Sequence, residues 1–564
     1  MQPQKTLNEY LAQAISENWD NPALTDLHSN SYTYGEVGEY IVRMHLIFRR
    51  MDVKRGDHIA ICASNSAEWA LTFLSAVTYG AVAVSILADF RPEDVVNLVN
   101  HSESKLLFVD SKVWRGLKDH ASELKDVFGV FDAGKSGAPE AVWQHGKSGK
   151  LSKALDTLDA DFAAAYPSGL NPDVIEFASI APDDTIVINY TSGSTGSPKG
   201  VMLTERNMWS NVQYSIDGLR FLVPGDTILS MLPLAHMFGL TVDLLHPFVK
   251  GCHIYFLMHA PTPAVLMSAF QEIRPKLVVS VPLVIEKIIK KKVFPVIQKM
   301  PTKLLLRLPV VRAVVRHKIR KSIIDAFGGR LQELILGGAG VSAEVEKFLR
   351  SIQFPFTVGY GMTECGPLIG YAPWFKQRSG TCGHVVDRMQ LRVDSENPSK
   401  IPGVMWVKGD NVMKGYFHNP EATEAVMGED GWMNTGDIGT VSSDGLISIK
   451  GRDKNMILGP SGQNIYPEEI EAKLNHMDGV GESLVIDEGE GRLLALVYPD
   501  PEFSEGKSAD EISNVISEDI KLLNKTLPGY SQVRNFRLMD QEFQKTPKRS
   551  IKRFLYTADT LHAS

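Results

Sequence analysis

A loop rich in glycine and hydroxyl side chains carries the clearest chemistry in the sequence. Residues 190–200 directly follow an apolar run, 185–189, that predicts a buried strand. Glycines let the backbone approach a ligand closely, and successive N–H groups and hydroxyls can converge on anionic oxygens. The loop is not the common P-loop, because that motif has Gly-Lys-Ser/Thr in series and here Pro198 precedes Lys199. We therefore expect a phosphate-binding loop of another kind, with Lys199 supplying a positive charge.

A second string, 358–367, could recognise a nucleotide. Tyr360 stands between two glycines, so its ring is open to stacking on a base. Thr363 can donate a hydrogen bond to a phosphate oxygen, and the Glu364 carboxylate is a hard oxygen ligand suited to Mg²⁺. A lone Glu is normally a surface residue, so the string alone leaves both interpretations of Glu364 open.

Three other features have simple interpretations when each is considered alone. The glycines of 337–340 follow an apolar run and are typical of a tight strand–helix turn. Asp437 lies in a glycine-containing turn, where Asp commonly bonds its own backbone. His236 lies in the apolar run 232–239, where a single His is more often a core residue.

Taken together, these strings resemble the signatures of the adenylate-forming (AMP-binding) superfamily, which includes acyl-CoA synthetases, firefly luciferase and the adenylation domains of nonribosomal peptide synthetases. The resemblance covers nearly the whole chain. It implies that the loop holds the β- and γ-phosphates of ATP. The loop residues to which it assigns this role are Thr191, Ser192, Gly193, Ser194, Thr195, Gly196 and Lys199.

The resemblance also implies the rest of the nucleotide site. Tyr360 would stack on adenine, Asp437 and Arg452 would bind the ribose hydroxyls, and Glu364 would hold Mg²⁺. The remaining AMP-binding residues would be Gly338, Ala339, Gly361 and Thr363.

The acyl and coenzyme A site is implied in the same way. It would include His236, Gly337 and Gly462, with 461–471 facing the site when the thioester forms. Lys454 matches the hinge about which the small domain rotates. A further motif is interpreted as structural; it contains Gly409, Gly415 and Tyr416.

The implied reaction is ATP-dependent ligation of a fatty acid to coenzyme A through an acyl-adenylate, with release of pyrophosphate and AMP. The required small molecules are ATP, Mg²⁺, coenzyme A and the acid. Residues 232–236 and 281–287 look most like the long-chain branch of the family. Two alternatives stay open: an acyl-AMP ligase that loads a carrier protein, and a catalytically weak protein that binds nucleotide or acyl-AMP.

The chain departs from the family pattern near its C-terminus. Family members place a Lys there that bridges the carboxylate and the α-phosphate, and Ser550 stands at that position. Serine cannot offset the repulsion between two anions. Either Lys548 or Lys552 reaches the site from a shifted register, or adenylation is slow. The expected catalytic residues are therefore Thr191, Lys199, Glu364, Lys548 and Lys552.

The elements that must position these residues indicate an α/β fold of more than one domain. With 564 residues, 44% hydrophobic and 22% charged, the chain is typical of a folded protein too long for one core. Apolar runs at 106–109, 185–189, 276–281 and 333–336 alternate with helical stretches, which predicts largely parallel buried strands.

Short strands separated by turns then predict a small barrel or antiparallel sheet over about 375–450. We expect a large N-terminal domain, 1–452, of two mostly parallel sheets with this β-rich subdomain. A small, mobile α+β domain, 453–564, would follow.

Charge and apolar patterning bear on location and partners. The net charge of −7 argues against a nucleic-acid binder, and four widely spaced cysteines fit a reducing cytoplasm. The uncharged run 69–88 is long enough to span a membrane, but Gly80 interrupts it, so we expect a buried helix, 67–79, and a strand.

Residues 287–324 hold twelve Lys or Arg and no Asp or Glu. They predict either a solvated basic face or a peripheral contact with the inner membrane surface. Oligomerisation stays open.

Overall fold

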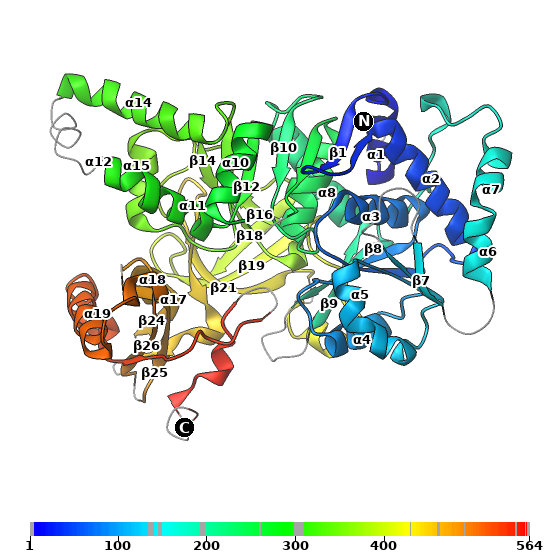
Figure 1. Ribbon diagram of the computed structural model, residues 1–564. Helices are drawn as coiled ribbons and strands as arrows, with labels where there is room; N and C mark the ends of the chain where they lie inside the picture. The colour runs from blue at the N-terminus through cyan, green and yellow to red at the C-terminus, as the bar shows by residue number, and fades with distance from the viewer. Residues whose placement is uncertain are drawn as a thin grey trace.

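The computed structural model describes most of the chain. The described residues are 5–132, 140–144, 149–191, 198–258, 261–297, 309–428, 430–459, 463–477, 479–489, 491–546, 550–558 and 560. The N-terminal half and the C-terminal residues lie at opposite ends of the molecule, as Figure 1 shows. Two large sheets covered by helices make up most of the body between them.

One large sheet carries the predicted phosphate-loop strand. Its order is β20-β9-β8-β4-β3-β5-β6-β7, and the pairs from β8 to β6 are parallel. The strands are β20 (Gly415–Tyr416), β9 (Lys199–Thr204), β8 (Thr185–Thr191), β4 (Val82–Ser85), β3 (His58–Cys62), β5 (Leu106–Val109), β6 (Gly129–Asp132) and β7 (Glu140–Gln144). The helices of this half of the molecule are α1 (Leu7–Glu17), α2 (Tyr34–Arg50), α3 (Ala67–Tyr79), α4 (Pro92–His101), α5 (Ser111–Leu117), α6 (Lys150–Asp156), α7 (Leu158–Ala165) and α8 (Glu205–Gly218).

The other large sheet has the order β14-β13-β12-β10-β11-β1-β2, and only the β1–β2 pair is antiparallel. Its strands are β14 (Phe356–Val358), β13 (Glu333–Leu336), β12 (Leu277–Ser280), β10 (Thr227–Ser230), β11 (His253–Phe256), β1 (Pro22–Asp26) and β2 (Ser31–Thr33). The helices between these strands are α9 (His246–Val249), α10 (Pro263–Ile273), α11 (Pro282–Ile288), α12 (Phe294–Ile297), α14 (Pro309–Ala326) and α15 (Ala343–Ser351). The predicted α/β class with two mostly parallel sheets is confirmed.

Antiparallel strands follow the two large sheets. A three-stranded sheet contains β15 (Tyr360–Gly361), β16 (Leu368–Tyr371) and β17 (His384–Val385). A four-stranded sheet contains β18 (Met389–Asp394), β19 (Gly403–Gly409), β21 (Met433–Val441) and β22 (Ile447–Arg452), with α16 (Pro420–Glu424) beside it. Of the two forms predicted for this region, the structure has the antiparallel sheet.

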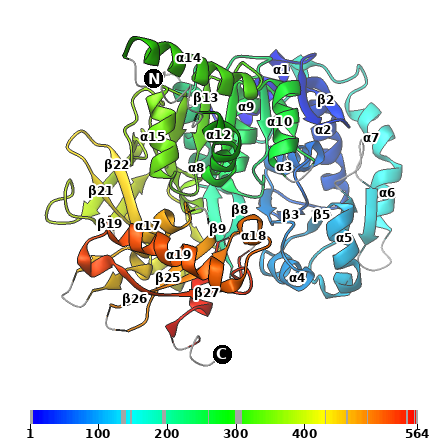
Figure 2. The same cartoon turned by 60° about the vertical axis from the view of Figure 1, so that its left-hand side comes forward.

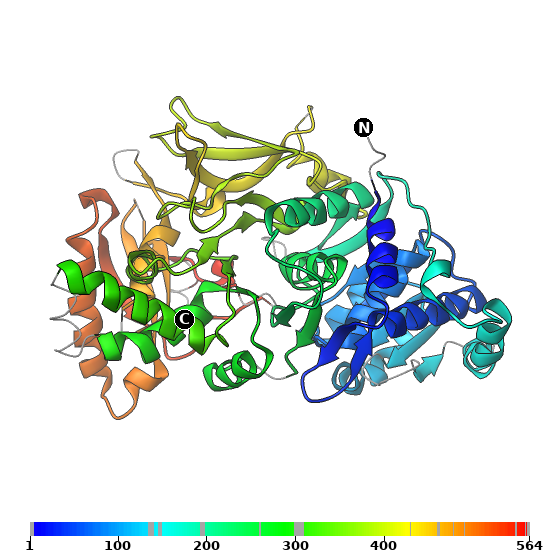
Figure 3. The ribbon, with the colours of Figure 1, turned by 90° about the horizontal axis from the view of Figure 1, so that it is seen from above.

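The last hundred residues form a compact α+β unit with a hydrophobic cluster of its own. Figure 2 shows it below the helices of the second large sheet, and Figure 3 shows it at the opposite end from the N-terminal helices. Its elements are β23 (Ile457–Leu458), β24 (Asn464–Ile465), α17 (Pro467–Leu474), β25 (Val480–Asp487), β26 (Leu493–Pro499), α18 (Pro501–Ser504), α19 (Ala509–Asn524) and β27 (Val533–Leu538). We call these residues, from 453 onward, the small domain and the preceding residues the large domain.

The uncharged run at 69–88 forms the predicted buried helix and strand. Ser66 caps the start of α3 by accepting a hydrogen bond from Trp69 N–H, and Gly80 ends the helix at a positive φ of 87°. In the described part of the chain, no helix combines the length and apolar character needed to span a bilayer.

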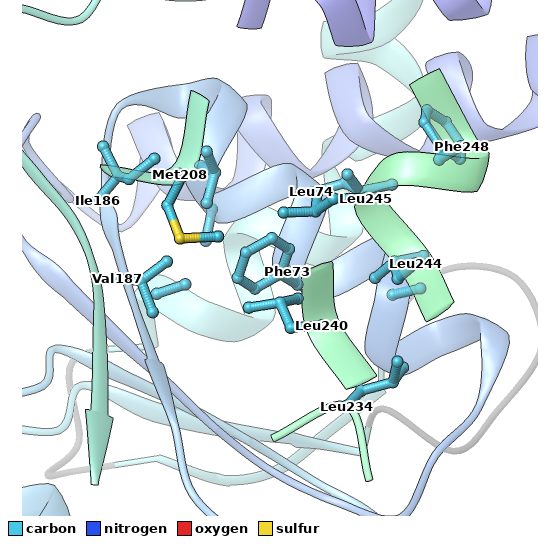
Figure 4. Packing of buried hydrophobic residues seen from close by; sticks show 14 of the residues in the cluster. Phe73, Leu74, Ile186, Val187, Met208, Leu234, Leu240, Leu244, Leu245 and Phe248 are labelled. Carbon is cyan, nitrogen blue, oxygen red and sulfur yellow. The ribbon is translucent and has the colours of Figure 1, made fainter. Parts of the chain in front are cut away.

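The core between α3 and β8 also fixes the region around His236. Phe73 and Leu74 of α3 pack with Val187 of β8 and with Leu240 and Leu245, as Figure 4 shows. These last two residues belong to a π-helix, Gly239–Leu245, which continues into α9. The strand before the phosphate loop and the segment that holds His236 therefore share one rigid core.

Candidate active site

A buried carboxylate joins three elements at the centre of the candidate site. Asp437 of β21 is 5% exposed, and its Oδ2 accepts a hydrogen bond of 2.7 Å from the hydroxyl of Tyr360 in β15. Its Oδ1 lies 2.9 Å from Nε of Arg452, the last residue of β22. The antiparallel register of β21 and β22 sets Asp437 opposite Arg452, so the local ladder produces this ion pair directly.

Opposing effects act on the charge of Asp437. Burial raises its pKa, while Arg452 and the Tyr360 hydroxyl lower it; Glu364 and Glu468 add negative charge nearby, and the net shift is upward. The negative charge of Glu364 thus affects the pKa of Asp437. The segment 358–367 and the turn that contains Asp437 therefore lie close to each other.

A second cluster gathers around Tyr416. Its hydroxyl donates a 2.9 Å hydrogen bond to Glu364 Oε1, and the Nζ of Lys199 lies 4.9 Å from the centre of its ring. Strand β20 brings Tyr416 here by pairing with β9, which begins at Lys199. Thr191 lies opposite Lys199 across the β8–β9 ladder. Thus Thr191, Lys199 and Glu364, which are far apart in sequence, meet at one edge of the sheet.

The loop after β13 is lined by apolar side chains. A Cβ added to Gly337 would come within 2.8 Å of the Phe238 ring, so only glycine fits against this ring. The neighbouring Gly338 has a φ of 81°, and Val281 Cγ1 lies 3.9 Å from the position that its Cβ would take. Ala339 follows as an exposed residue. Phe238 is two residues beyond His236, so the His236 segment and the glycine loop lie side by side.

The other residues of the second string lie on either side of Tyr360 and Glu364. Gly361 ends β15, and a Cβ there would meet the carbonyl oxygen of Pro367 at 2.3 Å. Thr363 begins a single turn that also contains Glu364.

Buried polar groups hold the His236 segment in place. Asn65 accepts a hydrogen bond from Leu234 N–H and donates one to Leu232 O, and Asn189 of β8 donates a 2.6 Å bond to Ala235 O. Asp243 of the π-helix is fully buried and accepts hydrogen bonds from the N–H groups of Met231 and Leu232. Burial raises the pKa of Asp243 to about 8.

Several predicted site residues fall outside the described residues: Ser192, Gly193, Ser194, Thr195, Gly196, Gly462 and Lys548. The structure therefore leaves their predicted roles untested.

In the C-terminal segment, Arg553 is the described cation whose charge acts on Lys454. Partial burial lowers the pKa of Lys454, and three cations lower it further: Arg452, Lys199 and Arg553. Ser550 is exposed, and Lys552 is hydrogen-bonded through its backbone to Gln544 and Leu555 of its own domain. Arg553 itself is held by Glu471, with both carboxylate oxygens at 2.8 Å from Nη1.

The sequence interpretation missed the position of Tyr416. It treated the Gly415-Tyr416 motif as structural, whereas this side chain contacts both Glu364 and Lys199. The pairing of β20 with β9 joins residues about 215 positions apart, so no local pattern near Tyr416 could have indicated it.

The fold and the clustered residues define an adenylate-forming type of enzyme. One solved structure illustrates the fold: ATP-bound MatB from Rhodopseudomonas palustris superimposes with a TM-score of 0.73, at 21% identity, over 98% of each chain. Residues 11–417 match the family of AMP-binding enzymes, and residues 454–559 match the AMP-binding enzyme C-terminal domain. The chain belongs to the AMP-binding enzyme family.

Curated relatives are distant and have varied names. A 4-coumarate–CoA ligase of Oryza sativa subsp. japonica is 28% identical, over 92% of this chain and 88% of that protein. A long-chain fatty acid–CoA ligase of Mycobacterium bovis is 27% identical, over 89% of this chain and 86% of that protein. These two relatives are named for different acids, 4-coumarate and a long-chain fatty acid.

We predict that the pKa of Asp243 makes stability depend on pH. The folded chain keeps this carboxyl protonated up to about pH 8, whereas an unfolded Asp releases its proton near pH 4. Between these values the folded state binds more protons, so wild-type stability should fall by at most about 1.4 kcal/mol per pH unit because of this group. The variant Asp243→Asn has no ionisable group here, so this pH dependence of stability is absent. Its amide oxygen can still accept the hydrogen bonds from Met231 and Leu232.

The measurement is urea unfolding of both proteins between pH 5 and 9. The difference in unfolding free energy should shift in favour of Asp243→Asn as the pH rises to about 8 and then level off. A difference that is constant over this range would contradict the prediction.

Proposed function

We propose that the chain is an AMP-forming acid–CoA ligase and that its acid is a long-chain fatty acid. The supporting observation is that Lys199 and Glu364 both contact Tyr416, while the charge of Glu364 also acts on Asp437. A cation, a hard carboxylate and a buried carboxylate in one place suit a triphosphate, its metal ion and a ribose, respectively.

In the proposed first step, a carboxylate oxygen of the acid attacks the α-phosphorus of ATP in line. The bond between the α-phosphorus and the bridging oxygen of pyrophosphate breaks, and acyl-AMP forms. The two reactants are both anionic, so positioned cations and hydrogen-bond donors must offset their repulsion. We assign this role to Thr191, Lys199 and Thr363, together with the loop 192–196.

In the second step, the thiolate of coenzyme A attacks the acyl carbon, and the bond from that carbon to the AMP oxygen breaks. The thiol proton passes to solvent, and AMP leaves with the oxygen that came from the acid. We propose that Asp437 and Arg452 hold the ribose, while Tyr360, Gly338, Ala339 and Gly361 line the adenine, through both steps.

Glu364 is suited to a magnesium ion that is also bound by the phosphates of ATP, rather than to an ion bound by protein side chains alone. No group of three or more metal-ligating side chains occurs among the described residues. Mg²⁺ commonly uses one or two carboxylates and takes its other ligands from phosphates and water. When bound there, it would neutralise phosphate charge, and Tyr416 would fix the orientation of the Glu364 carboxylate.

We propose that the boundary between the domains lies at 452–453 and that Lys454 is the hinge. Arg452 ends β22, and a single turn, Asp453–Asn455, links it to the small domain. Rotation here would bring 461–471, including Gly462, to the site for the second step.

The fatty acid proposal depends on the apolar side of the site. Phe238 and Val281 flank Gly337 and Gly338, and Val281 begins the string that resembles the long-chain branch. The relative named as a long-chain fatty acid–CoA ligase supports this choice. We place the acyl group between this wall and His236.

Ser550 motivates the rival interpretation, a weakly catalytic nucleotide or acyl-AMP binder. The peptide N–H of Ser550 donates to Thr546 Oγ1, and Ile551 pairs with Lys545 in an antiparallel bridge. In an extended segment, residues two apart share a side, so Lys552 shares the side of Ser550. We therefore propose Lys552 as the C-terminal catalytic cation, with Lys548 as the alternative.

The decisive experiment measures pyrophosphate release from ATP and palmitate, and then product mass with coenzyme A or a purified carrier protein as acceptor. We expect palmitate-dependent release and palmitoyl-CoA as the product, because the site has the cations that adenylation needs. Acylation of the carrier alone would instead favour the carrier-loading alternative.

Two variants should change pyrophosphate release in opposite directions. Glu364→Ala should lower release at least about tenfold, by removing a metal ligand that acts on the transferring phosphate. Ser550→Lys should raise it, by adding a cation at the family position. Release from the wild type no higher than from Glu364→Ala would overturn the enzyme proposal and favour the binder.

We also propose that α14 contacts an anionic membrane surface, from which the acid would enter. Within α14 the only acidic residue is Asp325, and the described cations are Arg312, Arg316, Lys318, Arg320 and Lys321. Val314 is 55% exposed among them, and Figure 1 shows α14 extending past the body of the molecule. Basic residues with apolar neighbours bind anionic headgroups.

The membrane proposal predicts a loss of vesicle binding when these five cations are changed to Gln. Flotation with vesicles containing phosphatidylglycerol should detect the wild type and lose this variant, and added salt should weaken wild-type binding. A control changes five exposed cations elsewhere: Lys54, Lys112, Lys118, Arg220 and Lys400. Equal binding by wild type and the α14 variant would leave the helix as ordinary solvated surface.

A further inference from the structure

An ion pair joins the two domains far from their covalent connection. Glu286 of α11 belongs to the large domain, and its Oε2 lies 3.0 Å from Nε2 of His476, which follows α17. The ammonium of Lys290 also donates a 3.1 Å hydrogen bond to the carbonyl of His476. Both the side chain and the backbone of one small-domain residue are thus held by α11 and by the π-helix that continues it, Ile289–Val293.

The Glu286 carboxylate is tied to the candidate site as well. Its Oε1 accepts a 2.7 Å hydrogen bond from the N–H of Ser342, the residue that caps α15. Ser342 follows the loop of Gly337, Gly338 and Ala339 by three residues. One buried carboxylate therefore links the glycine loop of the large domain to the small domain.

This carboxylate depends on its partners for its charge. Burial alone would raise the pKa of Glu286, but the hydrogen bonds from His476 and Ser342 outweigh burial, and the pKa lies below its ordinary value. The charged Glu286 carboxylate is only 9% exposed. If it lost His476, it would need either water or another cation as a new partner. The contact consequently favours the domain orientation in which it forms.

The position of the pair relative to the hinge makes it sensitive to rotation. Lys450 pairs with Glu469 at 3.1 Å, and Asn455 bonds Glu468, but these residues lie within twenty positions of each other beside the linker. Glu286 and His476 are 190 residues apart and lie on α11 and beyond α17, away from that linker. Figure 1 shows the small domain beside the end of the large domain that bears α11 and α12, and Figure 2 shows it below α12.

The present orientation also sets the C-terminal segment near the nucleotide side of the site. Lys454 is within electrostatic reach of both Lys199, beside the phosphate loop, and Arg553, at the C-terminus. The segment of Ser550 and Lys552 directly precedes Arg553. The adenylation step proposed above needs a cation of this segment beside the phosphates, so we assign the present orientation to that step.

We propose that Glu286 and His476 form an interdomain latch that holds the adenylation orientation and opens before the thioester forms. The inference depends on the two-step function proposed above, since only a two-step reaction needs the small domain to turn. Glu286 is thus a positioning residue: it acts through the placement of the small domain rather than by touching substrate.

The test compares Glu286→Gln and His476→Gln with a matched control, Glu346→Gln. Glu346 pairs with Arg350 at 2.9 Å and is also 9% exposed, and Arg350 is 20% exposed where His476 is 22%, but that pair lies wholly within the large domain. Each latch variant weakens one charged hydrogen bond, whereas Glu346→Gln weakens two from Arg350. The control should therefore lose at least as much stability as either latch variant.

Domain orientation is measured by energy transfer between dyes on Lys112→Cys and Lys525→Cys, one in each domain, in a Cys382→Ser background. Both latch variants should shift the orientation equilibrium by about tenfold, the effect of losing one buried charged hydrogen bond. Separately, pyrophosphate release with palmitate should fall several-fold in the latch variants, while thioester formation from synthetic palmitoyl-AMP and coenzyme A should stay equal or rise.

Unchanged energy transfer in both latch variants would overturn the proposal, as would a parallel loss of both half-reactions matching the loss in Glu346→Gln. His476→Gln, on the more exposed partner, keeps the test valid if Glu286→Gln does not fold. If the wild type activates no fatty acid, the proposed function fails, and the dye measurement still reports whether the latch holds the domains.

Discussion

The structure depends on one buried carboxylate having two partners. Asp437 is almost fully enclosed, so it needs both the Tyr360 hydroxyl and the Arg452 guanidinium to offset its burial. This need fixes β15, β21 and β22 against one another. Since Arg452 is followed directly by the turn Asp453–Asn455, the same interaction also anchors the start of that turn.

Electrostatic repulsion sets the main chemical constraint. A reaction between a carboxylate and a triphosphate needs cations where the two meet. Among the described residues, Lys199 and Arg452 both lie close enough to Lys454 to lower its pKa. Arg452 is paired with Asp437 and Arg553 with Glu471, whereas Lys199 lies over the Tyr416 ring. Positive charge is thus gathered around Lys454, while Ser550 stands at the position where the family resemblance implies a cation.

Elements were easier to predict from the sequence than contacts. The helix Ala67–Tyr79 and the strands Leu106–Val109 and Glu333–Leu336 have the predicted bounds, because contiguous apolar runs and capping residues are local signals. The resemblance also anticipated that Tyr360, Asp437 and Arg452 would be neighbours. It gave no access to the Tyr416 bridge or to Glu286–His476, since strand pairing and domain docking join residues about two hundred positions apart. Burial of Asp243 was equally hidden, because an acid within an apolar run carries no sign of what surrounds it.

The proposed acyl-adenylate intermediate is tested most directly by following the oxygen atoms of the acid. The chain is incubated with ATP, coenzyme A and palmitate labelled with ¹⁸O in both carboxylate oxygens, and the AMP is analysed by mass spectrometry. Attack of the carboxylate on the α-phosphorus, followed by thiolate attack on carbon, leaves one labelled oxygen in each AMP formed. AMP that carries no label, or label that appears in phosphate or pyrophosphate instead, would contradict an acyl-adenylate intermediate.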